Sequence, residues 1–196
     1  AMLALPAAAH SANIADVKLD GFVDIVWAVS DGTDLGINGS EGHFATSGEL
    51  DLKSKLNGGL TMRLDADLSP NSGGGDSAEL EQAFLGWSIN KELMLKAGVF
   101  NNNLSLEKED APDLYQITHS QLWDIWNSST DESGNNLQGV ELSYKQADFT
   151  VFLGFLNDLG GVSEENSVKL GVEVGAVKNM KITAGLITQD VGGSGV

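Results

Sequence analysis

The chain has 196 residues and a formal net charge of −17, and it contains 24 glycines, 3 prolines and no cysteine. The length predicts a single domain, and the acidic balance argues against nucleic acid as a partner, because a phosphate backbone is bound by Lys and Arg. The absence of cysteine excludes disulfides and thiolate metal sites. Apolar runs fall short of the roughly 20 residues of a spanning helix, which excludes a helical membrane protein but not a β-barrel with half-apolar strands.

The first residues resemble the end of a secretory signal peptide. An apolar stretch precedes small residues of the A-x-A kind between Ala7 and Ala12, although a basic n-region is missing. A chance Ala-rich tail is the alternative. We expect residues 1–12 to be a signal-peptide remnant, residues 13–196 to form the folded domain, and the protein to be exported.

The first predicted strand covers residues 17–30. Every second residue from Val17 to Val29 is apolar or glycine, and Lys and Asp occur among the others. A period of two places the apolar side chains on one face of a strand. Residues 31–43 are rich in Gly, Asp, Asn and Ser, and they predict a loop.

Residues 48–68 predict a β-hairpin. Leucines alternate with charged residues on both sides of Asn57-Gly58-Gly59. This tripeptide can supply the positive φ angles of a tight turn. Six more strands with the same alternation follow. They are predicted at residues 78–90, 93–100, 137–145, 149–155, 168–174 and 182–186.

The connections between these nine strands alternate in length. Long polar loops begin near residues 31, 69, 101 and 157, and short turns lie near residues 57, 90, 146 and 176. Outer-membrane barrels sort their loops in this way, with short periplasmic turns and long external loops. Greek-key sandwiches mix both lengths at each end.

Aromatic residues follow the same division. Trp27 and Phe155 lie near the long-loop ends of their strands, and Trp87, Tyr144 and Phe149 lie near the short-turn ends. In a transmembrane barrel, aromatic residues form one girdle at each membrane–water interface, and these five residues would fall into two such girdles. The sequence therefore predicts an all-β fold, an antiparallel up-and-down transmembrane β-barrel. Nine is an odd number and lipid requires closure, so we expect an incomplete barrel of about nine strands, truncated before closure.

The polar faces of the strands carry both acids and bases, which would form charged ladders across the wall of a channel. The alternative is the solvated outer face of a soluble sheet. The residues that we expect to line the pore are Asp51, Lys53, Arg63 and Asp65.

The longest irregular segment, residues 101–136, has too many apolar residues for plain disorder. A loop with an apolar anchor and an acidic face could fold into the barrel and narrow it. An external loop that packs on its neighbours, or that makes a subunit contact, is the alternative. The candidate constriction residues are Glu107, Lys108, Glu109, Asp110 and Asp113.

Three stretches resemble, in their order, Gram-negative outer-membrane porins of the phosphate-porin type. They are Leu-Glu-Gln-Ala-Phe-Leu-Gly-Trp at 80–87, Leu-Lys-Ala-Gly-Val-Phe at 95–100 and Leu-Ser-Leu-Glu at 104–107. The resemblance implies a β-barrel porin domain that contacts outer-membrane lipid and lipopolysaccharide, and a homotrimer is among its implications. In general porins the third external loop folds inward as a constriction, and residues 101–136 form the third long loop here.

This chain departs from the porin pattern after the fifth predicted strand. Asn102-Asn103-Leu104 stands where a turn containing Pro and Gly is common. The loop is also acidic, so anion or phosphate selectivity is not carried over.

Other sites find little support in the sequence. Asp31 to Gly36 hints at a calcium loop, but Leu35 occupies a ligand position and the closing Glu is missing. His43, His119 and Ser120 suggest a hydrolase, but nothing in their spacing requires a base, a nucleophile and an orienting carboxylate to lie within hydrogen-bond reach. We expect no metal, no cofactor and no enzymatic activity.

The expected function is passive diffusion of small hydrophilic solutes or ions through the outer membrane of a Gram-negative bacterium. The acidic balance predicts a mild preference for cations. The alternatives are a non-porous outer-membrane sheath or adhesin, a soluble extracellular β-sandwich, and an outer-membrane lipase or protease.

Overall fold

A computed structural model shows how most of the predicted strands are arranged. It describes residues 16–30, 41–69, 77–104, 107, 110–114, 119–121, 123, 125, 135–159, 166–175 and 180–188. The expected signal-peptide remnant, residues 1–12, lies outside these ranges. Within them, no helix has the length and apolar character needed to cross a membrane.

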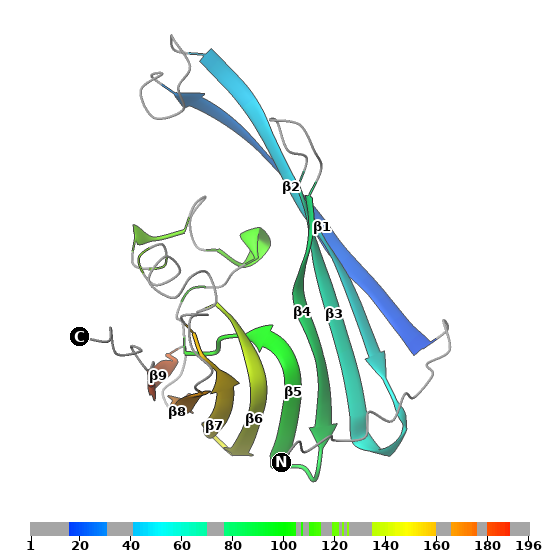
Figure 1. Cartoon of the computed structure of the whole chain (residues 1–196), viewed down its shortest axis with the longest axis vertical. Coiled ribbons are helices and arrows are strands. Elements are labelled where there is room, and N and C mark those ends of the chain that lie inside the picture. The colour runs from blue at the N-terminus through cyan, green and yellow to red at the C-terminus, as the bar shows by residue number, and fades with distance from the viewer. Residues whose placement is uncertain are drawn as a thin grey trace, which may run out of the picture.

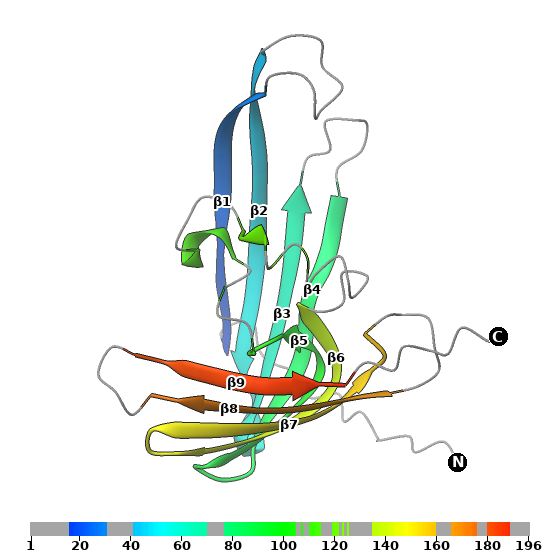
Figure 2. The same ribbon diagram turned by 90° about the vertical axis from the view of Figure 1, so that its left-hand side faces the viewer.

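One antiparallel sheet contains all nine strands, and each strand pairs with its neighbours in sequence (Figures 1 and 2). The all-β, up-and-down arrangement predicted from the sequence is confirmed. The sheet is open, with β1 and β9 at its edges. The strands are β1 (Val17–Ser30), β2 (Glu41–Lys55), β3 (Leu60–Ser69), β4 (Ser77–Ser88), β5 (Leu93–Asn101), β6 (Asn136–Gln146), β7 (Phe149–Asn157), β8 (Asn166–Val174) and β9 (Ile182–Ile187).

The turn between β2 and β3 has the predicted geometry. Gly58 and Gly59 have φ angles of 73° and 78°, and they lie in the short 3-10 turn Asn57–Gly59. The backbone N–H of Leu56 donates to the carbonyl oxygen of Leu60 at 2.8 Å and closes the hairpin. Only residues without a Cβ adopt such angles at little cost, so the tight turn follows from the sequence.

The predicted start of β2 is wrong. Residues 41–43 belong to the strand, although their composition predicted a loop. The reason is tertiary: the long β1 continues to Ser30, and residues 41–44 complete its hydrogen-bonding ladder opposite residues 27–30. The pairing places Phe44 beside Trp27, with ring centroids 4.6 Å apart.

The sheet has an inverted polarity, which means that charged side chains are buried on one face and apolar side chains are exposed on the other. Its inner face, the face that carries Asp65 and Glu141, has charged side chains that are 0% and 1% exposed. Its outer face carries apolar side chains in water-accessible positions, and Leu19 and Val23 are 64% and 71% exposed. The five aromatic residues expected at the girdles are all exposed on the outer face: Trp27, Trp87, Tyr144, Phe149 and Phe155.

An apolar patch interrupts the charged inner face on β5, β6 and β7. Phe100, Leu137 and Leu156 are at most 1% exposed, and they pack with Leu159. This departs from the expected separation of the strands into one apolar and one polar face. Phe84 and Ile187, which are partly buried, pack against this cluster. Apolar side chains therefore contact one another here, where charged groups occupy the rest of the inner face.

Candidate functional site

The four predicted pore-lining residues lie side by side on the inner face. The register of β2 and β3 places Asp51 opposite Asp65 and Lys53 opposite Arg63. Lys53 Nζ is 2.5 Å from Asp51 Oδ2, and Arg63 Nη2 is 3.7 Å from Asp51 Oδ1. Arg63 Nε also pairs with Asp65. The structure thus joins all four in one ion-pair ladder, and their role in lining a pore stays a prediction.

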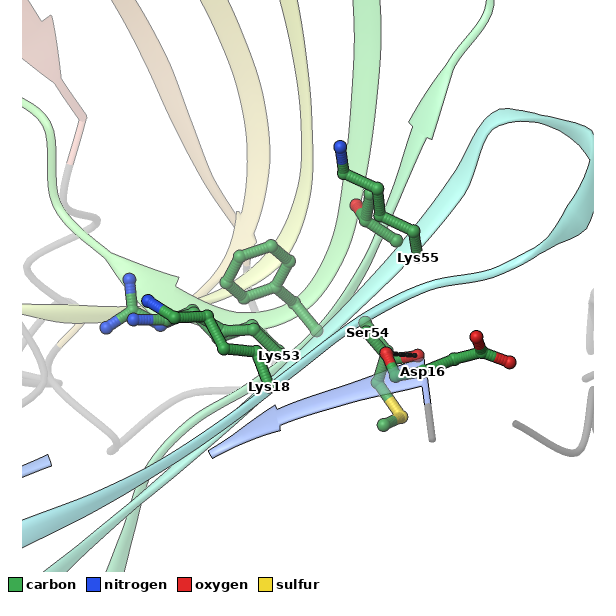
Figure 3. A pocket seen from close by; sticks show the side chains of 9 residues that line it. Asp16, Lys18, Lys53, Ser54 and Lys55 are labelled. Atoms are coloured by element: carbon green, nitrogen blue, oxygen red, sulfur yellow. Dashed lines mark hydrogen bonds between the residues drawn. The ribbon is translucent and has the colours of Figure 1, made fainter. Parts of the chain in front are cut away.

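A basic zone lies at the turn end of this ladder. Lys18 of β1 stands opposite Lys53 of β2, and the two side chains extend in parallel into a hollow of about 530 Å³ (Figure 3). Lys55 and Arg63 also line the hollow. Four basic side chains thus gather near the β2–β3 turn, and three of them, Lys18, Lys53 and Arg63, are ion-paired with carboxylates.

An acidic zone follows further along the same strands. It contains Glu49 of β2, Asp67 of β3 and Glu81 of β4. A β-bulge creates it: Asp65 pairs with Gln82, whereas the next residue, Ala66, pairs with Leu80. The extra residue in β4 lets Glu81 and Gln82, which are 7% and 3% exposed, both enter the inner face.

A second ion-pair network lies on β5, β6 and β8. Lys169 Nζ is 2.6 Å from Glu141 Oε2, and Lys96 Nζ is 3.2 Å from Glu141 Oε1. Both side chains of the Lys169–Glu141 pair are 0% exposed. Two cations, of which only Lys169 is fully buried, satisfy both oxygens of the buried carboxylate, a geometry that a buried pair needs.

The described residues at the start of the segment after β5 lie over the inner face. Asn103 donates to Glu141 at 3.3 Å and accepts a hydrogen bond from Lys169. The side chain of Leu104 lies over Gly171 and Gly185, where a Cβ on either glycine would collide with it. Because both glycines lie on β8 and β9, the start of the long segment is anchored on the opposite part of the sheet.

A later part of the same segment lies near the ion-pair ladder of β2 and β3. The carboxyl group of Asp110 interacts electrostatically with Arg63, Asp51 and Lys53. Burial raises the pKa of Asp110 above its usual value, against the attraction of Arg63, which lowers it. The described residues of the segment therefore contact β8 and β9 and interact electrostatically with β2 and β3, and Figures 1 and 2 show its short helical pieces on this side of the sheet.

The other candidate constriction residues differ in their surroundings. Glu107 accepts hydrogen bonds from the backbone N–H and hydroxyl of Ser120, at 2.8 and 2.5 Å. His119 Nδ1 is 3.3 Å from Glu107, and its ring stacks on Trp123 at 4.7 Å. Asp113 is exposed. The remaining two candidates, Lys108 and Glu109, lie outside the described residues.

The contact between Glu107 and Ser120 predicts a pH dependence. Hydrogen bonds from Ser120 lower the pKa of Glu107 below its usual value of 4.5. A lowered folded-state pKa stabilises the fold above pH 4.5, and this stabilisation is lost as the pH falls through the folded value. We expect Ser120→Ala to raise the pKa of Glu107 toward 4.5, as measured from ¹³C shifts of labelled Glu carboxyl groups.

Ser143→Ala is the matched control for this titration, because Ser143 lies on β6 and its hydroxyl donates to the carbonyl oxygen of Met94. It should leave the Glu107 titration unchanged. An equal response to both substitutions would contradict the assignment.

Sequence reasoning did not select several residues that are central to these networks. Lys96 and Asn103 bind Glu141, and Gln82 donates to Asp65. Their alternation with apolar neighbours could have placed Lys96 and Gln82 on the inner face. Nothing in the sequence marks the bulge that brings in Glu81, because its cause is the pairing of β3 with β4.

Comparison with known proteins gives no further guidance: no family model matches the chain, and no curated protein matches it.

Proposed function

We propose that the chain forms part of the wall of an outer-membrane β-barrel that conducts small hydrophilic solutes or ions. The inverted polarity of the sheet is the observation on which the proposal rests. Lys169 and Asp65 are 0% exposed on the inner face, whereas Leu186 and Trp27 are 65% and 55% exposed on the outer face. A protein surrounded by water would bury its apolar side chains and expose its charged ones, since contiguous exposed apolar surface is unfavourable in water.

In a bilayer the same arrangement is stable. The apolar outer face would meet hydrocarbon, and the exposed aromatic residues would lie at the two interfaces. Unpaired backbone groups are costly in lipid, so β1 and β9 would each pair with a further strand when the barrel closes. The charged inner face would then surround an aqueous lumen.

The segment after β5 would narrow this lumen. Its support is two observations described above: Leu104 packs over Gly171 and Gly185, and Asp110 interacts electrostatically with Arg63. Both of these described residues of the segment therefore lie over the inner face. With Asp110 and Asp113 in this segment and a net charge of −17, the channel would prefer cations.

Planar-bilayer recording of the full-length protein tests the proposal. We expect discrete conductance steps, and a reversal potential under a KCl gradient that indicates a preference for K⁺. The double substitution Asp110→Asn and Asp113→Asn should reduce this preference, because it removes two charges from the segment in the lumen.

Asp148→Asn is the matched control, since Asp148 is exposed in the short turn between β6 and β7. It should leave the reversal potential unchanged. Anion preference would contradict the proposed selectivity, and the lack of any conductance would favour the non-porous outer-membrane protein.

A further inference from the structure

Three carboxylates from three adjacent strands converge on the inner face. They are Glu49, Asp67 and Glu81, and one oxygen of each lies within 4.8 Å of the others. The register of β2 and β3 places Glu49 opposite Asp67, and the bulge in β4 turns Glu81 toward both. Glu49 and Glu81 are buried and Asp67 is exposed, and negative charges at this separation repel one another unless a counter-charge is present.

Among the described residues, no ion pair involves these three carboxylates, although Arg63 attracts Glu81 at longer range, whereas their neighbours on β2 and β3 are ion-paired. Asp51 and Asp65 form ion pairs with Lys53 and Arg63. In the part of the chain that the structure describes, Glu49 forms no ion pair, and its buried Oε1 has no hydrogen-bond partner. A carboxylate that is 6% exposed, with one oxygen unpartnered and only another acid, Asp51, as a side-chain partner, is unfavourable, so the geometry favours a positive ligand.

A fourth carboxylate comes from the segment after β5. Asp110 interacts electrostatically with Glu49, Asp67 and Glu81. Its Oδ1 is also buried without a hydrogen-bond partner among the described residues. The cluster therefore joins three strands of the wall to the segment that lies over it.

We propose that Glu49, Asp67 and Glu81 bind a divalent cation, with Ca²⁺ as the ion that fits best, and that Asp110 faces the same ion. Hard cations prefer carboxylate oxygens, and Ca²⁺ accepts six to eight of them at about 2.3 to 2.6 Å. Two oxygens on opposite sides of Ca²⁺ are thus about 4.6 to 5.2 Å apart, a span that accommodates these three residues. Mg²⁺, with bonds of about 2.0 to 2.1 Å, requires a tighter octahedron.

Binding of a cation at this site would hold the segment that contains Asp110 against strands β2, β3 and β4. The ion neutralises repulsion between Asp110 and the three wall carboxylates, so it should hold the segment close to β2, β3 and β4. The sequence did not suggest this site, because its members lie in three strands and one of them faces inward only through the bulge. The proposal goes beyond conduction, because binding does not require an open channel.

Calorimetric titration of the full-length protein in detergent micelles with CaCl₂ tests the site. We expect saturable binding with a dissociation constant on the order of 10⁻⁴ to 10⁻³ M, and weaker binding of MgCl₂. Glu49→Gln should weaken Ca²⁺ binding by roughly tenfold or more, since even groups beyond the ligands affect metal affinity by about ten- to a hundredfold. Glu81→Gln should act in the same direction and provides a second variant if the first does not fold.

Glu173→Gln is the control, because Glu173 lies on β8 and pairs with Lys181 at 2.6 Å. It removes the same charge from the inner face and should leave Ca²⁺ binding unchanged. The proposal is overturned if the unmodified protein shows no saturable Ca²⁺ binding up to millimolar concentration, or if Glu173→Gln weakens binding as much as Glu49→Gln. Conductance without Ca²⁺ binding would overturn this site alone, whereas Ca²⁺ binding without conductance would overturn only the channel.

Discussion

Lys169→Met is expected to lower the free energy of unfolding by about 3 to 5 kcal/mol. Lys169 and Glu141 are both 0% exposed and lie 2.6 Å apart, so the substitution leaves a buried carboxylate with only part of its neutralising charge. Lys96, at 3.2 Å from the other oxygen, compensates in part. Urea unfolding of the refolded protein in detergent, followed by tryptophan fluorescence, measures the change.

Lys181→Met provides the comparison. Lys181 also pairs with a carboxylate at 2.6 Å, but its side chain is 54% exposed. An exposed pair contributes less than about 1 kcal/mol, because water screens both charges. If the two lysines gave equal losses, the buried network would not be a main stabilising element of the sheet.

Adding Glu141→Gln to the Lys169→Met protein refines this prediction. The second substitution removes the unbalanced charge, so the double variant should be more stable than the sum of the two single losses predicts. Both residues also bind Asn103, at the start of the segment after β5. Each substitution at Lys169 or Glu141 should therefore alter the single-channel conductance as well as the free energy of unfolding, because it removes a side chain that holds Asn103.

Gly98→Ala is expected to lower the free energy of unfolding by about 3 to 5 kcal/mol. Gly98 has a φ of 131°, which L side chains rarely adopt. A Cβ there would overlap the carbonyl oxygen of Ala83 and lie 2.8 Å from the Cα of Phe84. Since both neighbours belong to the backbone of β4, the strands would have to separate. The same unfolding measurement applies.

Gly58→Ala separates the cost of a positive φ from the cost of steric overlap with a neighbouring strand. Gly58 also has a positive φ, of 73°, but nothing lies within 4 Å of the Cβ that alanine would add. Its expected loss is about 1 to 2 kcal/mol, from the left-handed backbone alone. A loss at Gly98 no larger than that at Gly58 would show that close approach of β4 and β5 is unimportant.

The positions of the strands follow from local sequence. An apolar residue at every second position defines β1, β5, β7 and β8 closely, because a strand alternates its side chains between two faces. The same alternation determines that Asp51, Lys53, Arg63 and Asp65 share one face. Asn57-Gly58-Gly59 determines the tight turn, because its glycines adopt positive φ readily. These features need no knowledge of distant residues.

Tertiary structure alone decided which partners those residues meet. The start of β2 depends on the ladder offered by β1, and the entry of Glu81 depends on a bulge in the pairing of β3 with β4. The start of the segment after β5 is held by Lys169 and Gly185, which lie more than sixty positions from Asn103 and Leu104 in the chain. Alternation fixes the face of a residue, but register shifts and long-range contacts determine its neighbours, and these arise only when the whole sheet has formed.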